Sequence, residues 1–154
     1  MMRQHRTTGR QSIWEYPRTP AVEPTPRRIQ VVHRNCTIAD TTRARRVLEM
    51  GHPPNYYIPP EAIRLELLEP TDHTTFCEWK GIAVHFDLYV GDEVIESAAW
   101  YYPEPTRRYE AIRDFVAFYP QRVDACMVDG EVAKGESNPF YGGWITSEIE
   151  GPFR

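Results

Sequence analysis

Residues 80–102 contain the strongest folding signal in this chain, two runs of β-forming residues on either side of Gly91-Asp92. Glycine at the first central position of a two-residue loop accepts the positive φ that a type II′ turn requires, so the pattern predicts a tight hairpin. Extending the pairing outward from the turn places three pairs opposite each other: Leu88 with Ile95, Phe86 with Ser97, and Val84 with Ala99.

The two faces of this predicted hairpin differ in character. One face carries Leu88 and other apolar side chains and is expected to be the core. The opposite face sets Ala83 and Gly81 across from Trp100 and Tyr102. Small residues beside large rings leave room, so the second face is predicted to line a pocket.

Two further turn signals indicate more hairpins. Arg34-Asn35 and Asp129-Gly130 each interrupt β-type runs with residues that tolerate positive φ. The strands expected outside the first hairpin are residues 29–33, 36–40, 63–68, 115–119, 122–128 and 131–133.

Two short helices are expected between these strands. Residues 43–50 have apolar side chains at positions i, i+3 and i+4 after a threonine cap, and Gly51 ends them. A second helix is expected from Thr106 to residue 114. Because strands outnumber helices and no βαβ alternation occurs, the predicted fold class is mainly β, with antiparallel hairpins in a small barrel-like domain.

The distribution of prolines divides the chain. Residues 1–27 hold several prolines, which fix φ and remove backbone donors, so they are predicted to be an extended and partly disordered arm. Residues 28–154 are predicted to be a single β domain, a length that can bury a core. The aromatic stretch at residues 140–144 is expected to pack over an open edge of that domain.

The composition argues against several partners. A formal net charge of −4 does not suit a protein that binds nucleic acid. No run approaches the roughly 20 apolar residues that cross a bilayer, and no apolar segment follows the N-terminal arginines, so no membrane partner or signal peptide is expected. Three cysteines without close spacing are typical of reduced thiols, and we expect a cytoplasmic protein.

Two residues are candidates for catalysis. Cys77 is the best nucleophile, because a lysine near a thiol stabilises the thiolate and Lys80 follows it closely. In an extended chain the two side chains point to opposite faces, so Lys80 is expected to pair with Glu78 instead. Glu104, between two prolines and near Trp100, is the acid–base candidate. A purely structural role, as a buried thiol or a solvated turn carboxylate, stays open for both.

The usual cofactor motifs are absent from the sequence. Without Cys-x-x-Cys or His-x-x-x-His spacing, no metal or other cofactor is expected. The chain has no glycine-rich phosphate loop and no Asp-x-Asp pair after Gly-Ser, which a nucleotidyltransferase would need. It also lacks the Gly-x-Ser-x-Gly elbow of many serine hydrolases.

Several stretches along the chain are distinctive when taken in order. They are Thr41-Thr42-Arg43-Ala44, Tyr56-Tyr57-Ile58-Pro59, Thr75-x-Cys77-x-x-Lys80-Gly81, Ala98-Ala99-Trp100-x-Tyr102-Pro103-Glu104-Pro105 and Val116-Ala117-Phe118-Tyr119-Pro120. Together they resemble the family called domain of unknown function 427, over residues 28 to 133, with flanks similar to those of actinobacterial members. The resemblance implies a bacterial protein with a small β fold related to the β-tent group, in which some members hold ligands in an aromatic cage. The nucleotidyltransferase label sometimes given to the family has no counterpart in these residues.

These observations predict a small-molecule-binding domain and leave open whether it is an enzyme. The ligand is expected to be anionic or cyclic and held by Arg43 and Lys80, with Cys77 or Glu104 as the reactive group if chemistry occurs. The alternative is a non-catalytic protein-interaction module that uses the Pro-rich N-terminus and the aromatic C-terminus, and nucleotidyl transfer is a third hypothesis. The expected pocket walls are Tyr57, Trp100, Tyr102 and Tyr119.

Overall fold

Antiparallel pairing joins nearly all of the strands in residues 10–153, the part of the chain that this computed structural model describes. The first four-stranded sheet runs β10 (Val116–Phe118), β9 (Glu93–Tyr101), β8 (Gly81–Val90) and β7 (Leu68–Cys77). The second runs β12 (Glu131–Val132), β11 (Ala125–Val128), β3 (Ile29–His33) and β4 (Cys36–Thr41). A three-stranded sheet runs β2 (Ala21–Pro24), β5 (Arg45–Leu48) and β6 (Asn55–Tyr57). A short parallel pair joins β1 (Gln11–Ser12) to β13 (Ile149–Glu150).

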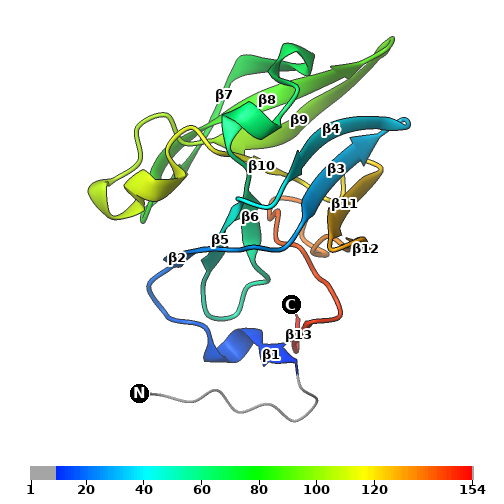
Figure 1. Cartoon of the computed structure of the whole chain (residues 1–154). Coiled ribbons are helices and arrows are strands. Elements are labelled where there is room, and N and C mark those ends of the chain that lie inside the picture. The colour runs from blue at the N-terminus through cyan, green and yellow to red at the C-terminus, as the bar shows by residue number, and fades with distance from the viewer. Residues whose placement is uncertain (1–9, 154) are drawn as a thin grey trace.

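The sheets are arranged around a shared core rather than in a closed cylinder. Figure 1 shows the long strands β7, β8 and β9 at one end of the molecule and the β1–β13 pair at the other. The mainly β, antiparallel class is therefore confirmed, but the sheets within the described residues stay open and the predicted barrel-like closure is wrong. No helix in residues 10–153 is both long enough and apolar enough to cross a membrane.

The predicted tight turns are present. Arg34 and Asn35 have φ of 49° and 61°, and Asp129 and Gly130 have φ of 49° and 84°, as two-residue hairpin loops require. Gly91 has φ of 60° at the first central position of its loop. These turns are encoded locally by residues that tolerate positive φ, so a short sequence window is enough to find them.

The predicted register of the main hairpin holds only near its turn. Leu88 pairs with Ile95 as expected, but a bulge follows, and Phe86 then pairs with Ala99 instead of Ser97. Because the slip is two residues, Ala99 and Trp100 beyond the bulge keep their predicted faces, whereas Ser97 within the bulge leaves the core face on which it was expected. The far end of the expected core face is nevertheless open to solvent, with Ile82 56% exposed.

The prediction of two short helices is wrong in its first member. Residues 45–48 form β5, which pairs with β2 on one side and β6 on the other. Where the second helix was expected there is a 3-10 helix, η4 (Arg107–Ile112). The predicted strand at residues 63–68 is also wrong, because β7 begins only at Leu68. The other short helical turns described are η1 (Ile13–Glu15), η2 (Pro60–Ala62) and η3 (Leu65–Leu67), all of 3-10 type.

Both ends of the described chain pack on the sheets. Trp144 is fully buried, stacks against Tyr56 with ring centroids 4.8 Å apart, and donates from Nε1 to the Phe118 carbonyl at 3.1 Å. At the other end Ile13 is buried with Leu48. The first nine residues of the predicted arm lie outside the described residues, and the division at residue 27 stays a prediction.

Candidate functional site

A cavity of about 490 Å³ lies against the predicted pocket face of the main hairpin. Strands β7, β8 and β9 supply one side of it, and β6 supplies Tyr57. The segment that follows β12 closes another side. The residues that line it are Glu49, His52, Asn55, Tyr57, His73, Thr75, Phe76, Cys77, Lys80, His85, Ser97, Trp100, Tyr102, Tyr119, Arg122, Glu136, Phe140, Tyr141 and Gly142.

Four buried rings form the apolar wall of the cavity. Trp100 lies 4.6 Å from Tyr119 between centroids and meets Tyr57 edge-on at 6.2 Å. Trp100 also donates from Nε1 to the Tyr57 hydroxyl at 3.3 Å. Burial raises the pKa of both Tyr57 and Tyr102, so both hydroxyls keep their protons and remain hydrogen-bond donors.

Lys80 is buried in the cavity wall, with only 6% of the residue exposed. Residues 78–80 form the turn between β7 and β8, and this turn brings Lys80 Nζ to 3.4 Å from Cys77 Sγ. The expected extended chain is therefore wrong here, and Lys80 does not pair with Glu78. Nζ lies 5.9 Å from the centroid of the Tyr102 ring, and no carboxylate of the described residues is within ion-pair distance of it.

Arg122 places a second positive charge on the cavity wall. Its guanidinium lies over the Tyr119 ring at 3.9 Å and donates to the carbonyl oxygens of Ser97, at 2.6 Å, and Pro139, at 2.9 Å. Like Lys80, it forms no ion pair with a carboxylate in residues 10–153. The neighbours of both positive charges are therefore a thiol, aromatic rings and carbonyl oxygens, and not carboxylates.

Two polar atoms of the lining residues have no partner. In the part of the chain described, the buried side-chain atoms without a hydrogen bond are Asn55 Oδ1 and His85 Nδ1. The other ring nitrogen of His85 is 3.0 Å from Thr75 Oγ1. Burial, helped by electrostatic interactions with His73 and Arg122, lowers the pKa of His85 to about 4, so the ring is neutral at pH 7. Buried polar groups are normally satisfied, so these two atoms are exceptions within the described residues.

The segment after β12 adds a carboxyl group and a glycine. Burial raises the pKa of Glu136, while the Gly143 N–H, which donates to Glu136 Oε2 at 3.0 Å, acts in the opposite direction. At Gly142 a Cβ atom would collide with the Trp100 ring, so only glycine lets the backbone approach so closely. Gly142 thus lets this backbone segment lie directly against the Trp100 ring in the cavity wall.

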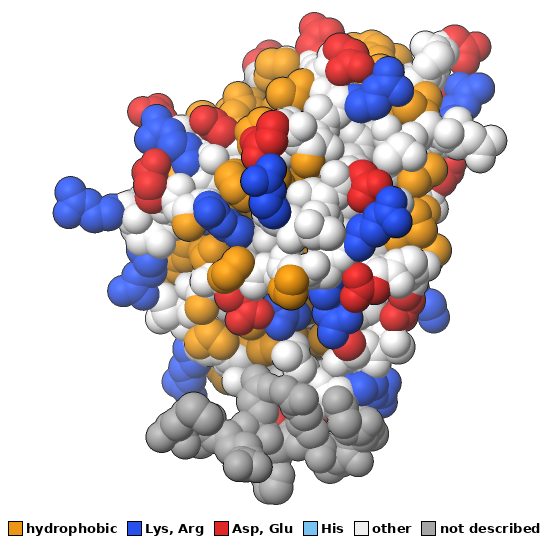
Figure 2. Space-filling model, viewed as in Figure 1, with side chains coloured by type: hydrophobic (Ala, Val, Ile, Leu, Met, Phe, Trp, Pro, Cys, Tyr) orange, Lys and Arg blue, Asp and Glu red, His pale blue; other side chains and the backbone are white. Residues whose placement is uncertain are grey.

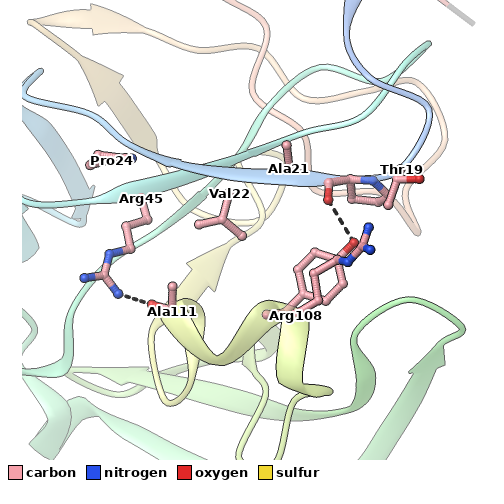
Figure 3. Close-up of a pocket in the computed structure, with 9 residues that line it drawn as sticks. Thr19, Ala21, Val22, Pro24, Arg45, Arg108 and Ala111 are labelled. Carbon is pink, nitrogen blue, oxygen red and sulfur yellow. Dashed lines mark hydrogen bonds between the residues drawn. The ribbon is translucent and has the colours of Figure 1, made fainter.

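Figure 3 shows a second cavity, of about 530 Å³, between β2 and η4. In this cavity the Arg45 guanidinium points at the Ala111 carbonyl and donates a hydrogen bond to it. The guanidinium also lies over the Phe115 ring, 4.8 Å from its centroid. Tyr109 donates to the Pro20 carbonyl at 2.8 Å. The Tyr109 hydroxyl and the Arg45 guanidinium already have protein partners, which makes this cavity the weaker candidate.

The visible surface and the described titratable groups show the following features. On the face shown in Figure 2, basic and acidic side chains alternate, and the coloured residues form no broad basic patch. Residues 10–153 contain no group of three His, Cys, Asp or Glu side chains placed to hold a metal ion.

Comparison with known proteins identifies the family of this chain. Residues 21–129 match the family model NTP_transf_9, described as domain of unknown function (DUF427). The chain belongs to the DUF427 family. No curated protein matches it. The DUF427 match covers the strands that carry the cavity and ends before Glu136 and Gly142, so one side of the cavity is built by residues beyond the matched region.

The DUF427 domain brings together most of the predicted site residues. Cys77, Tyr57, Lys80, Trp100, Tyr102 and Tyr119 all line the cavity. Arg43 does not, because its side chain is 78% exposed and lies near Glu61, and Glu104 is an exposed turn residue. The roles assigned to these residues stay predictions.

Sequence reasoning missed several lining residues of the DUF427 domain. No local pattern indicates Arg122 or Asn55, since each reaches the cavity only through long-range packing. The Gly142-Gly143 pair beside aromatic residues is a usable signal, because adjacent glycines among large side chains indicate a close backbone approach.

Proposed function

We propose that this DUF427 domain binds a small anionic ligand with a ring system in the cavity beside Trp100. The observation that carries the proposal is the burial of Lys80 without a carboxylate partner. Removing an ammonium group from water is costly unless an opposite charge compensates for it. An anion bound in the cavity would supply that charge.

The rest of the lining suits the same ligand. Arg122 offers a second cation, and guanidinium groups bind carboxylate and phosphate groups well. The rings of Trp100 and Tyr119 favour a flat partner between or against them. The free acceptor Asn55 Oδ1 favours a ligand that carries an N–H or O–H donor. This arrangement also fits the aromatic cages found in some members of the β-tent group.

If the ligand reacts, Cys77 is the first candidate for a reactive group. Its sulfur lies beside Lys80 in the lining, where the ammonium stabilises negative charge on sulfur. Arg122 replaces Arg43 in the proposal as the second anchor, because Arg43 points into solvent. Glu136 replaces Glu104 as the acid–base candidate, since it lines the cavity.

A thermal-shift screen tests the proposal, using aromatic carboxylates and nucleoside monophosphates with and without divalent metals. Ligands that raise the melting temperature are then titrated by calorimetry against Lys80→Met. We expect at least a tenfold loss of affinity in this variant. Lys134→Met is the matched control, because Lys134 is the only other lysine and lies exposed outside the cavity. Equal binding by wild type and Lys80→Met would refute the proposal.

One observation favours a protein-interaction role as the second candidate. Phe76 and Ile82 pair across β7 and β8 and are 75% and 56% exposed, an unusual placement for such side chains. A ligand screen without hits, together with capture of a protein partner that Ile82→Ser abolishes, would favour this role over ligand binding, because Ile82 lies outside the cavity. A magnesium-dependent shift with nucleoside triphosphates would instead favour nucleotidyl transfer.

A further inference from the structure

His73 and Ser97 are bonded across an intervening strand. His73 belongs to β7 and Ser97 to β9, and β8 lies between these two strands. Their side chains nevertheless meet, with His73 Nδ1 2.9 Å from Ser97 Oγ. Both residues line the cavity proposed to bind the ligand.

Two bulges at the same level of the sheet make this contact. The pairing of β7 with β8 shifts between Pro70 and Thr74, which frees the segment that holds His73. The pairing of β8 with β9 shifts at the level of Asp87, which frees Ser97. Bulges redirect side chains and are common beside active sites, so two that converge on one hydrogen bond indicate a functional arrangement.

The backbone of Ser97 is held in an unfavourable conformation. Its φ is 50°, in the left-handed region that residues with a side chain seldom adopt. Asp87 Oδ1 accepts from the Ser97 N–H at 3.0 Å, and Arg122 donates to the Ser97 carbonyl at 2.6 Å, so both backbone groups are fixed. Strain of this kind persists where the surroundings impose it and is concentrated at functional sites.

The ring of His73 is held as firmly as the serine. It stacks on His85 with centroids 4.3 Å apart, and its backbone N–H donates to Thr71 Oγ1 at 3.1 Å. Thr71 in turn donates to the carbonyl of His85 at 2.9 Å. A serine hydroxyl bonded to a positioned imidazole is the nucleophile–base geometry of covalent ester hydrolysis.

We propose that Ser97 and His73 form a nucleophile–base pair that hydrolyses carboxylic esters of anionic compounds held in the cavity. The choice of an anionic substrate rests on the function proposed above, whereas the reactivity of the pair does not. With His73 protonated on Nε2, the Ser97 hydroxyl donates to Nδ1. Arg122, bonded to the Ser97 carbonyl, places a positive charge beside the reacting centre, where negative charge develops on the ester oxygen.

The reaction has two balanced steps. Ser97 Oγ bonds to the ester carbon while its proton passes to His73, the bond to the leaving alcohol breaks, and the alcohol takes that proton. Water then attacks the acyl-serine, His73 accepts the proton of the water and returns it to Ser97 Oγ, and the carboxylic acid leaves. No oxidation or reduction occurs, and water is the only co-reactant.

Labelling of the full chain with an alkyl fluorophosphonate tests the pair directly, because this neutral probe needs no anion site. We expect a covalent adduct on the peptide that contains Ser97, formed at least tenfold more slowly in His73→Gln and absent in Ser97→Ala. Ser97→Gly provides a second variant, since glycine adopts the positive φ without strain. Ser147→Ala is the matched control, because the Ser147 hydroxyl donates to a carboxylate, Glu131, at 2.7 Å instead of to an imidazole.

The substrate class is tested with two chromogenic esters. Hydrolysis of 4-nitrophenyl hemisuccinate should exceed that of neutral 4-nitrophenyl acetate, and Lys80→Met should remove this preference without abolishing labelling. A folded wild-type protein that gives no Ser97 adduct, or a His73→Gln protein that labels at the wild-type rate, would overturn the pair. Ligand binding by the same wild-type preparation shows separately whether the proposed binding function holds.

Discussion

The rings of His73 and His85 lie stacked, with centroids 4.3 Å apart and planes 25° from parallel. Such stacking is favourable while at least one ring is neutral. His85 meets this condition, because burial, together with electrostatic interactions from His73 and Arg122, lowers its pKa to about 4. The pair therefore links the pH of the solution to the stability of the sheet around the cavity.

Stability should fall as the pH drops from about 6.5 towards 4. The folded-state pKa of His85 lies below its ordinary value of 6.5, so in this window the unfolded chain binds a proton that the folded chain does not. Proton binding therefore stabilises the unfolded chain relative to the folded chain. We expect a loss of about 2 kcal/mol in the free energy of unfolding, measured by urea denaturation at several pH values.

The variant His85→Gln should flatten this dependence, since glutamine can bond to Thr75 but does not titrate. His52→Gln, a change in another lining histidine, is the control and should leave the slope near that of wild type. A His85→Gln protein with the wild-type slope would show that His85 is not the titrating group.

Replacing Lys80 by methionine should stabilise the empty protein. Methionine fills a similar volume without a buried charge, so the free energy of unfolding is expected to rise by about 1 kcal/mol. Urea denaturation measures the change, with Lys134→Met as the exposed control, expected near zero. Gained stability together with lost ligand binding would mark Lys80 as a functional residue, and a large destabilisation would mark it as structural.

Gly142→Ala should disturb the cavity wall. The new Cβ would collide with the Trp100 ring, which is packed against Tyr119 and has little freedom to move. We expect a loss of about 2 kcal/mol in unfolding free energy, in the range of overpacked cores. Gly135→Ala is the control, because the atoms nearest to its Cβ belong to the Gln121 side chain, whose movement would break only two exposed hydrogen bonds, and its loss should be smaller. Equal losses would contradict the rigid packing of Trp100.

The three cysteines should differ in reactivity in the native protein. Cys126 is fully buried, and burial raises the pKa of its thiol, so it should react with a disulfide reagent only after unfolding. Cys36 and Cys77 are half-buried and should react natively. Lys80→Met should slow the reaction of Cys77 severalfold and leave Cys36 unchanged, which peptide mass spectrometry can assign. Equal rates at Cys77 in both proteins would argue against an interaction with Lys80.

The tight turns could be predicted because their information is local. Arg34-Asn35 and Asp129-Gly130 need only residues that tolerate positive φ, and the structure places both pairs there. The same local reasoning failed for β5. This strand is central, covered by β2 and β6 at its edges, and Arg46, Val47 and Leu48 are all buried. Consecutive burial removes the alternation that identifies a strand, and the spacing of its apolar residues imitates a helix.

Only the residues of the candidate site that lie on one face of the main hairpin could be predicted from the sequence. Trp100 and Tyr102 were placed beside a pocket because alternation along a strand decides the face of each residue. Arg122 and Glu136 reach the cavity from segments whose position depends on the packing of the whole chain, so no window of sequence contains that information. The contact of Lys80 with Cys77 depends on a turn in which strand alternation no longer applies.

The hydrogen bond between His73 and Ser97 depends on the number of residues in the strands as much as on their identity. Between the pair Leu88–Ile95 and the pair Phe86–Ala99, one strand contributes a single residue and the other contributes three. An insertion or deletion in either strand would change that difference, whereas a substitution that leaves both bulges intact alters the chemistry of the site and not the residue count. Relatives of this domain can therefore keep every side chain of the cavity and still lose the pair through a change in loop or strand length.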